Sequence, residues 1–564
     1  MSTFYLFFVI AFVTISQCPL TIADPVVHLG HAKIVGTYMP GYKISSFEAF
    51  LGIPYAKPPL GRLRFANPVP ADPIIGVFNA TTARDDCIQK NYLLKTPVIL
   101  GDEDCLYLNV YRPVGASSEQ PLPVMVYIYG GGFFSGTANP GITGPAYFMD
   151  TQKVILVTMA YRLGAFGFLS TGDESSPGNY ALKDQSMALR WIHENILKFG
   201  GDKDSVTIFG QSAGGASVHM HMLSERSINY FHRAIVMSGN AAAPYNDYLK
   251  NPLAQARLQA KYLGIPRWNR LTSVQLIAAL RRVNAIDILE AGDKFKYWHV
   301  DPMTVFRPVV EKNIPGAFMT KDPKEVVKTG AFRHIPWMIT SVPYEGAVRT
   351  LSILSNKTLV EDFNKSFDEL LIRLMEIEYN SPKQRNWYVQ KLVDQYMNGV
   401  RVLSEKTGQG FGDMITGRAF VQPMNFTIEQ YMKYADLDKN PLYLLKFNYR
   451  GAYSYSYLFA ENFQNYGVVH CDELIYLFSS PSLGFNIDQE STDANVSAAL
   501  VDNYVAFAIE GRPQHSEAKP CSNNQSVCEY LEFKNSENSS GFEITTSDEY
   551  DDSETTFWNN LISY

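Results

Sequence analysis

The sequence predicts an α/β fold with a mainly parallel central sheet, helices on both of its faces and helical insertions over the site. Two observations predict it. Apolar, β-branched segments alternate with helical segments along most of the chain, which is typical of strands buried on both faces of a parallel sheet. In addition, a serine between two glycines follows one of these segments and opens a helix, the context of a nucleophile at a strand end.

Six segments are expected to form the sheet, and two long insertions interrupt their alternation with helices. The expected strands are residues 124–129, 154–161, 206–209, 234–237, 336–340 and 443–447, with helices over 181–199 and 213–223. The insertions span about 245–306 and 350–439. In the second, Phe367, Leu370, Leu371 and Leu374 share one helix face, which predicts an amphipathic helix packed on the core. Such helices could also wall an apolar gorge above the serine.

The motif Gly210-Gln211-Ser212-Ala213-Gly214 is interpreted as a nucleophile elbow. The turn between strand and helix is so sharp that the serine backbone is strained, and small flanking residues let neighbouring backbone pass close by. A pentapeptide of this form also arises by chance. The strand before it and the helix after it supply the context that the motif requires.

A serine nucleophile needs an imidazole base, and we select His470 from ten histidines. His470 lies in a glycine-led loop beyond the expected strand 443–447 and ahead of an apolar helix. His219 and His221 lie on the helix after the elbow, too near in sequence to reach back to Ser212. Their spacing also places them on different helix faces, which disfavours a metal pair. His193 and His232 are interpreted as surface or core groups.

The acid that orients the histidine is expected at the end of an intermediate strand, because the order along the chain is serine, acid, histidine in this type of enzyme. Glu345 follows the expected strand 336–340 within a terminal turn. Without Ser212 and His470, the better interpretation would be a solvated turn glutamate.

The oxyanion hole is predicted in Tyr129-Gly130-Gly131-Gly132-Phe133, directly after the expected strand 124–129. Consecutive glycines let bare backbone N–H groups point at one oxygen. Gly131, Gly132 and Ala213 are the expected donors. The alternative is a glycine-rich turn with no particular partner.

The first 23 residues are interpreted as a signal peptide, with an apolar run over 4–15 and cleavage before Asp24. The absence of Lys and Arg from its first residues weakens this interpretation slightly. Residues 24–564 are expected to form a single secreted, soluble domain without a membrane anchor. The acidic segment 548–554 is expected to be a solvated surface segment.

Composition and cysteine usage agree with export. The net charge of −7 and the absence of a basic stripe argue against a nucleic-acid partner. Cys87 is expected to pair with Cys105, and Cys521 with Cys528, although the sequence cannot prove this connectivity. Cys471 would remain as a free, buried thiol. Seven glycosylation sequons are present, at Asn79, Asn356, Asn364, Asn425, Asn495, Asn524 and Asn538.

Taken together, these motifs resemble the type-B carboxylesterase and cholinesterase family of α/β hydrolases. The resemblance extends over nearly the whole expected mature chain, and its segments are 50–56, 64–65, 103–110, 129–133, 178–180, 184–185, 199–202, the elbow, Glu345 and the His470 loop. It implies the triad Ser212, His470 and Glu345, and the disulfide Cys87–Cys105. It implies no metal or other cofactor.

Within this family, the chain most resembles insect juvenile hormone esterases, and Gln211 is the residue that discriminates. Many relatives carry Glu, His or Met at that position. The Cys87–Cys105 loop lacks the tryptophan with which cholinesterases bind a cation, so a choline ester is disfavoured. Tyr129 replaces a histidine common in esterases, which leaves the backbone donors unaffected.

The resulting prediction is a secreted serine esterase that hydrolyses a small apolar ester, namely the methyl ester of juvenile hormone, through an acyl-enzyme. The nearest alternative is a broad-specificity insect carboxylesterase acting on xenobiotic, pheromone or seminal esters. A remote alternative is a non-catalytic adhesion protein, disfavoured because all three triad residues are present. A histidine base predicts activity that falls below about pH 6.5. The oligomeric state is left open.

Overall fold

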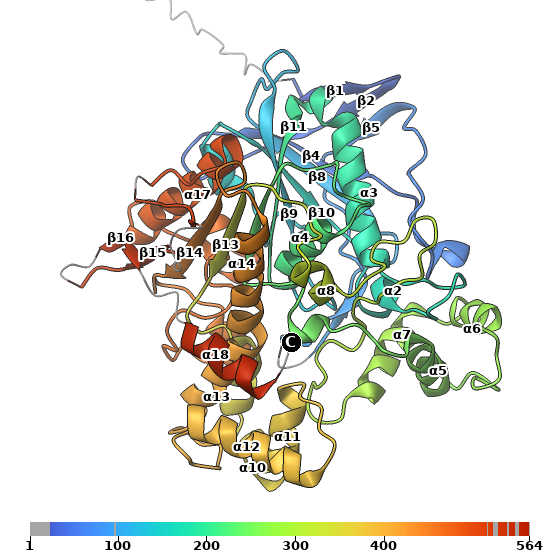
Figure 1. Ribbon diagram of the computed structural model, residues 1–564. Coiled ribbons are helices and arrows are strands. Elements are labelled where there is room, and N and C mark those ends of the chain that lie inside the picture. The colour runs from blue at the N-terminus through green and yellow to red at the C-terminus, as the bar shows by residue number, and fades with distance from the viewer. Residues whose placement is uncertain are drawn as a thin grey trace, which may run out of the picture.

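The computed structural model describes residues 23–94, 97–515, 517–522, 528–537, 541–547 and 552–562. Within these residues, eleven strands form one sheet in the order β16-β15-β14-β13-β12-β11-β9-β10-β8-β4-β3 (Figure 1). The strands are β3 (Thr37–Met39), β4 (Phe47–Pro54), β8 (Tyr107–Arg112), β9 (Leu122–Ile128), β10 (Ile155–Met159), β11 (Gly201–Gln211), β12 (Arg233–Met237), β13 (Trp337–Ser341), β14 (Leu442–Asn448), β15 (Tyr530–Asn535) and β16 (Phe542–Ser547).

The centre of this sheet is parallel and its two ends are antiparallel. Strands β10, β9, β11, β12, β13, β14 and β15 pair in parallel, whereas β8, β4 and β3 at one end and β16 at the other pair antiparallel. The central strands are almost wholly buried, as expected for strands covered on both faces. The prediction of a mainly parallel sheet is therefore confirmed, with β9 to β14 as the six expected strands.

Helices flank the sheet in two groups that both contact β9 and β11. Helix α4 (Ala213–Leu223) packs with α3 (Tyr180–Asn195) and α8 (Pro323–Lys328), whereas α17 (Thr492–Glu510) packs with α1 (Ala146–Asp150) and α16 (Leu474–Leu477). The helix expected over 181–199 is α3 followed by a 3₁₀ turn, which ends at Gly200 with φ of +84°. Two short helices, α2 (Gly164–Phe168) and α15 (Ser456–Ala460), lie in connections.

Both long insertions are helical, and the second has an apolar core of its own. The first contains α5 (Pro252–Tyr262), α6 (Ser273–Leu280) and α7 (Ala285–Ala291); the second contains α9 (Ala347–Leu354), α10 (Lys357–Lys365), α11 (Phe367–Leu374), α12 (Pro382–Tyr396), α13 (Gly408–Thr416), a π-helical turn η5 (Gly417–Val421) and α14 (Gln422–Tyr434). Figure 1 places α10 to α13 together at one end of the molecule. Phe367, Leu370 and Leu371 are buried in this second core and Leu374 packs against it, so the predicted helix face is confirmed.

Of the acidic segment 548–554, only the last residues are described, and there Ser553 is exposed and Glu554 is half-buried, accepting a hydrogen bond from the Tyr396 hydroxyl at 2.6 Å. Residues 548–551 lie outside the described residues, but helix α18 (Asp552–Leu561) follows directly. Its Trp558 is fully buried among the insertion helices, with its ring centroid 6.1 Å from that of Tyr396. The apolar face of Trp558 and Leu561 draws this segment into the second core despite the acidic residues before it.

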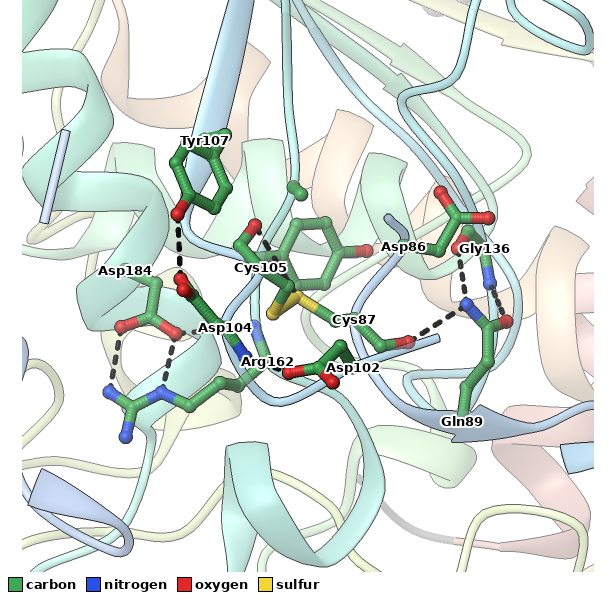
Figure 2. Close-up of a disulfide and its surroundings, with 12 residues drawn as sticks. Asp86, Cys87, Gln89, Asp102, Asp104, Cys105, Tyr107, Gly136, Arg162 and Asp184 are labelled. Carbon is green, nitrogen blue, oxygen red and sulfur yellow. Dashed lines mark hydrogen bonds and ion pairs between the residues drawn. A yellow bond between two sulfur atoms is a disulfide. The ribbon is translucent and has the colours of Figure 1, made fainter. Parts of the chain in front are cut away.

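Both expected disulfides are present, and the first supports the glycine-rich loop. Cys87 is bonded to Cys105, and Cys521 to Cys528. Beside the first bridge, the Gln89 side chain donates to the carbonyl of Gly136 and accepts from its N–H, both at 2.8 Å (Figure 2). Through Gln89, the two-stranded ribbon of β6 (Gln89–Lys90) and β7 (Ile99–Leu100) beside the disulfide is held against the loop after β9. A separate small sheet contains β1 (Val26–Leu29), β2 (Ala32–Val35) and β5 (Gly76–Asn79).

The structure corrects one glycosylation prediction. Asn425 is only 2% exposed and its Nδ2 donates a hydrogen bond to Thr555 at 2.7 Å, which leaves no room for a glycan on that nitrogen. Asn79 and Asn495 are exposed, and Asn356 and Asn364 are half-buried, with Asn364 Nδ2 donating to the Leu403 carbonyl at 2.9 Å. Asn524, Asn538 and residues 1–22 of the expected signal peptide lie outside the described residues.

Candidate active site

Ser212 occupies the strained turn between β11 and α4. Its backbone has φ of +59° and ψ of −123°, a conformation that residues with a side chain rarely adopt. The turn is possible because the motif glycines lie against backbone: a Cβ atom on Gly214 would lie 2.0 Å from the carbonyl oxygen of Ile128. A Cβ atom on Gly210 would lie 2.5 Å from the same oxygen. These glycines let β9 approach the turn and hold the serine at its apex.

His470 and Glu345 meet where the loop between α15 and α16 lies beside the turn after β13. The Nδ1 of His470 donates to Oε2 of Glu345 at 2.5 Å, and both side chains are 1% exposed. The other carboxylate oxygen of Glu345 accepts from the Val342 N–H at 3.1 Å. A backbone bond from Tyr344 to Val468, 3.1 Å long, ties the two loops together. The sequence prediction that these two residues would lie together is therefore met by a direct hydrogen bond.

Asp472 fixes the shape of the histidine loop. Its carboxylate accepts hydrogen bonds from the backbone N–H of Val469 at 3.0 Å and of Tyr455 at 2.7 Å, and from the hydroxyl of Ser454. Burial raises its pKa to about 7. These bonds hold the residues on either side of His470, so the imidazole is oriented by its backbone as well as by Glu345.

The glycine loop after β9 presents bare amides to the same cavity as Ser212. Gly131 has φ of +105° and Gly132 has φ of +61°, which a side chain would disfavour. Gly131, Gly132, Ser212, Ala213 and His470 all line this cavity. Among the described residues, neither the Gly131 nor the Gly132 N–H has an intramolecular acceptor. Ala213 opens α4, where backbone N–H groups lack helical partners.

Two of the histidines set aside by the sequence analysis, His219 and His221, are core groups, whereas His193 and His232 are half-buried. Nδ1 of His219 accepts from the Ala241 N–H at 3.1 Å, and His221 bonds to Ser227 and to Gln185 at 2.8 and 2.9 Å. Burial lowers the pKa of each to about 3, so both are neutral at physiological pH. They serve packing between α4 and its neighbours.

Gln211 contacts the predicted base directly, which the sequence could not show. Its side-chain Nε2 donates to Nε2 of His470 at 3.2 Å, and the residue is 1% exposed. This bond needs an unprotonated Nε2, which is the tautomer that results when Nδ1 donates its proton to Glu345. Cys471, expected to be buried, is instead half-buried and lines the cavity as a free thiol; burial raises its pKa well above the ordinary value.

Glu473 is the second acidic residue of the histidine loop, and it gives a prediction for stability. It is 2% exposed, neither carboxylate oxygen has a partner within the described residues, and burial followed by repulsion from Glu345 raises its pKa to about 8. A folded-state pKa above the unfolded one means that stability is complete below about pH 4.5 and is lost as pH rises through 8. We expect Glu473→Gln to remove this loss.

The variant should match the wild type near pH 5 and exceed it at pH 8 by an amount on the order of 4 kcal/mol in the free energy of unfolding. Urea titrations at the two pH values measure this difference. If Glu473→Gln raised the free energy of unfolding by the same amount at both pH values, Glu473 would not titrate in this way.

The cavity beside Ser212 has a volume of about 420 Å³ and is walled largely by the insertions. This lies in the usual range for small-molecule sites. Apolar side chains dominate its wall, among them Leu93, Met303, Leu374 and Phe420, whose ring lies 5.1 Å from that of His470. Four arginines also reach the wall, at positions 307, 349, 373 and 418, and no sequence motif indicated them.

Comparison with known proteins agrees with this geometry. The model of the carboxylesterase family matches residues 23–558. The chain belongs to the carboxylesterase family. It is therefore a carboxylic ester hydrolase with the α/β-hydrolase fold, as its sequence motifs predicted.

Several relatives of this carboxylesterase act on named esters or carry general esterase names. A juvenile hormone esterase of Tribolium castaneum is 39% identical over 510 residues, which cover 88% of this chain and 85% of that protein. A carboxylic ester hydrolase of Bombus ignitus is 34% identical over 531 residues, covering 92% of each chain. The crystal structure of the Manduca sexta juvenile hormone esterase, with OTFP covalently attached, is similar with a TM-score of 0.80 at 25% identity and covers 96% of this chain and 100% of that chain.

Proposed function

We propose that Ser212, His470 and Glu345 form the catalytic triad of this esterase, with Gly131, Gly132 and Ala213 as the oxyanion hole. The hydrogen bond between His470 and Glu345, at the wall of the cavity that Ser212 and the bare amides share, is the observation that carries the proposal. Each group has the chemistry that acyl transfer requires: a nucleophile, a base, an orienting carboxylate and N–H donors.

In the first half of the reaction, Ser212 Oγ attacks the ester carbonyl carbon while Nε2 of His470 takes the hydroxyl proton. The carbonyl oxygen becomes an oxyanion that accepts hydrogen bonds from the three amides. His470 then returns the proton to the leaving alkoxide, the C–O bond breaks, and an acyl-enzyme remains. Water repeats these steps on the acyl-enzyme and releases the acid. Glu345 stabilises the imidazolium in both halves, and each oxyanion donor typically contributes on the order of 3 kcal/mol.

We propose juvenile hormone as the substrate, with the hormone acid and methanol as products. The similarity to two juvenile hormone esterases and the largely apolar wall of the cavity support this proposal. A broad carboxylesterase is the alternative, supported by the similarity to the Bombus ignitus carboxylic ester hydrolase.

Hydrolysis of juvenile hormone at nanomolar concentration, beside a short naphthyl ester, tests the substrate. A low KM for the hormone that is absent in Ser212→Ala protein is the expected result. Turnover of the naphthyl ester alone would replace the hormone with the broad-specificity alternative, and turnover of neither ester would refute catalysis.

We also propose that the protein is secreted after removal of residues 1–23. The two disulfides support an oxidising compartment. No helix among the described residues has the length and apolarity that crossing a membrane requires. Expression in insect cells should deliver protein to the medium with Asp24 as its first residue, and retention of Met1 in cell-associated protein would contradict this.

The contact between Gln211 and His470 provides a test of whether His470 is the catalytic base. We expect Gln211→Glu to move the acid limb of the kcat/KM profile to higher pH by about one unit, because a carboxylate beside Nε2 stabilises the imidazolium and removes the free base. Gln211→Met, which has no charge, is the matched control and should show a smaller upward shift, because it removes only the hydrogen bond to the unprotonated Nε2. If the acid limb stayed in place in Gln211→Glu, His470 would not be the group that the profile reports.

A further inference from the structure

The arginines of the cavity wall differ in how their charges are compensated. Arg307 donates to Glu376 at 2.8 Å, Nε of Arg349 donates to Asp301 at 3.0 Å, and Arg373 pairs with Glu369 at 2.8 Å. Arg418 has no carboxylate partner among the described residues. The wall thus carries one guanidinium whose charge no neighbouring carboxylate balances directly.

Arg418 is nevertheless buried and held in place. It is 5% exposed, its Nε donates to the carbonyl of Met375 at 3.3 Å, and its Nη1 donates to Oε1 of Gln422 at 2.9 Å. The guanidinium also lies over the ring of Trp558, 5.7 Å from the centroid. Within the described part of the chain, its Nη2 group has no hydrogen-bond acceptor. A guanidinium on the cavity wall with a free N–H group and no counter-charge can bind an acceptor oxygen that a ligand supplies.

The backbone around Arg418 places it at the wall of the cavity beside Ser212. The π-helical turn η5 spans Gly417–Val421, and its consecutive residues Arg418, Ala419 and Phe420 all line the cavity. Turns of this type are rare and occur frequently at functional sites. Because Phe420 packs on His470, the same short turn contacts the predicted base and carries the unbalanced guanidinium. A ligand that reaches Ser212 therefore occupies the cavity that Arg418 lines.

We propose that Arg418 is a specificity residue that binds an acceptor oxygen of the substrate, on the part of the molecule that lies against α11 and η5. The substrate class is an ester with a largely apolar body and a second oxygen function remote from the ester carbonyl. That oxygen can be neutral, as in a ketone or an ether, or anionic, as in a carboxylate. The inference rests on the proposed function, since it takes the cavity beside Ser212 as the ester site.

Three methyl esters of one chain length test it: methyl dodecanoate, methyl 11-oxododecanoate and monomethyl dodecanedioate. Binding is measured by calorimetry on the Ser212→Ala protein, which does not consume them, and then on Ser212→Ala with Arg418→Met. For each oxygen-bearing ester, we compare its Kd with that of the plain ester. We expect the ratio of the plain-ester Kd to the oxygen-bearing-ester Kd to fall about 10-fold when Arg418 is replaced, because a hydrogen bond to a charged group typically contributes that much.

Ser212→Ala with Arg373→Met is the matched control, because Arg373 lines the same wall with its charge compensated; its ratio should stay unchanged. A fall confined to the oxo ester identifies a neutral acceptor, and a fall confined to the dicarboxylate an anionic one. The proposal is overturned if Arg418→Met leaves both ratios unchanged, or if the two arginine variants lower them equally. The Ser212→Ala protein, which keeps Arg418, also provides a test that carries no risk of misfolding at Arg418. If this protein bound the plain ester more tightly than both oxygen-bearing esters, the proposal would likewise be overturned. Hydrolysis by the wild type, measured in parallel, tests the proposed function separately.

Discussion

Replacement of Ser212 by alanine is expected to lower kcat by about 10⁶-fold, the loss seen when the nucleophile of a serine hydrolase triad is removed. Without Oγ no acyl-enzyme can form, so the residual rate comes from substrate binding and the oxyanion amides acting on water. The fold should persist, because the strained backbone at Ser212 is fixed by Gly210 and Gly214 rather than by the serine side chain. Steady-state hydrolysis of a naphthyl ester, with thermal unfolding as the check on folding, measures the effect.

The control for this variant is Ser217→Ala. Ser217 lies one turn further along α4, is fully buried and donates to the Ala213 carbonyl at 2.8 Å. Its replacement should change kcat by less than about 10-fold, because it holds no reacting group. If Ser212→Ala kept more than one hundredth of the wild-type kcat, Ser212 would not be the nucleophile.

Replacement of Glu345 by glutamine is expected to lower kcat by about 10⁴-fold. The carboxylate accepts the Nδ1 proton of His470 and thereby leaves Nε2 free to act as a base. A glutamine amide can donate to Nδ1 instead, which would place the proton on Nε2 and remove the base. It also removes the negative charge that stabilises the imidazolium in the transition state.

Glu473→Gln is the matched control for Glu345→Gln. Both glutamates are buried in the same region, but Glu473 makes no hydrogen bond to His470 within the described residues. The pKa of Glu473 near 8 keeps its side chain mostly protonated at pH 7, so glutamine is close to isosteric and isoelectronic with it. We expect kcat within about 10-fold of the wild type at this pH. Equal losses in both variants would contradict a specific role for Glu345.

The central sheet and the elbow could be predicted because their determinants are local. Buried parallel strands are continuous apolar runs, and the elbow is a five-residue motif between a strand and a helix. The reason for its glycines is not local, because a Cβ atom on Gly214 would collide with the carbonyl oxygen of Ile128. The antiparallel hairpin β15 and β16 was not predicted, since Glu532 and Lys534 interrupt the apolar run of β15 and β16 is only half buried along its length. The burial of Trp558 depends on packing against helices more than 100 residues away in sequence, which no local pattern encodes.

The candidate site also has parts that the sequence predicted and parts that it did not. Order along the chain and the position after strand ends were enough to select Glu345 and His470, and the structure joins them by a hydrogen bond. The contact between Gln211 and His470 depends on rotamers at two distant loops, so the sequence marked Gln211 as unusual without indicating its partner. The sequence also could not show that Arg418 lacks a carboxylate partner, because its neighbours Met375 and Gln422 are known only from the fold. The burial of Asn425 likewise shows that a sequon pattern carries no information on exposure.

Identification of the residue that carries the acyl group tests the central claim most directly. The protein is incubated with a fluorophosphonate ester, digested, and the modified peptide is sequenced by mass spectrometry. The account predicts one adduct per chain, on Ser212, with loss of activity in proportion to labelling and no adduct in the Ser212→Ala protein. An adduct on another residue, or full esterase activity in protein labelled at Ser212, would contradict it.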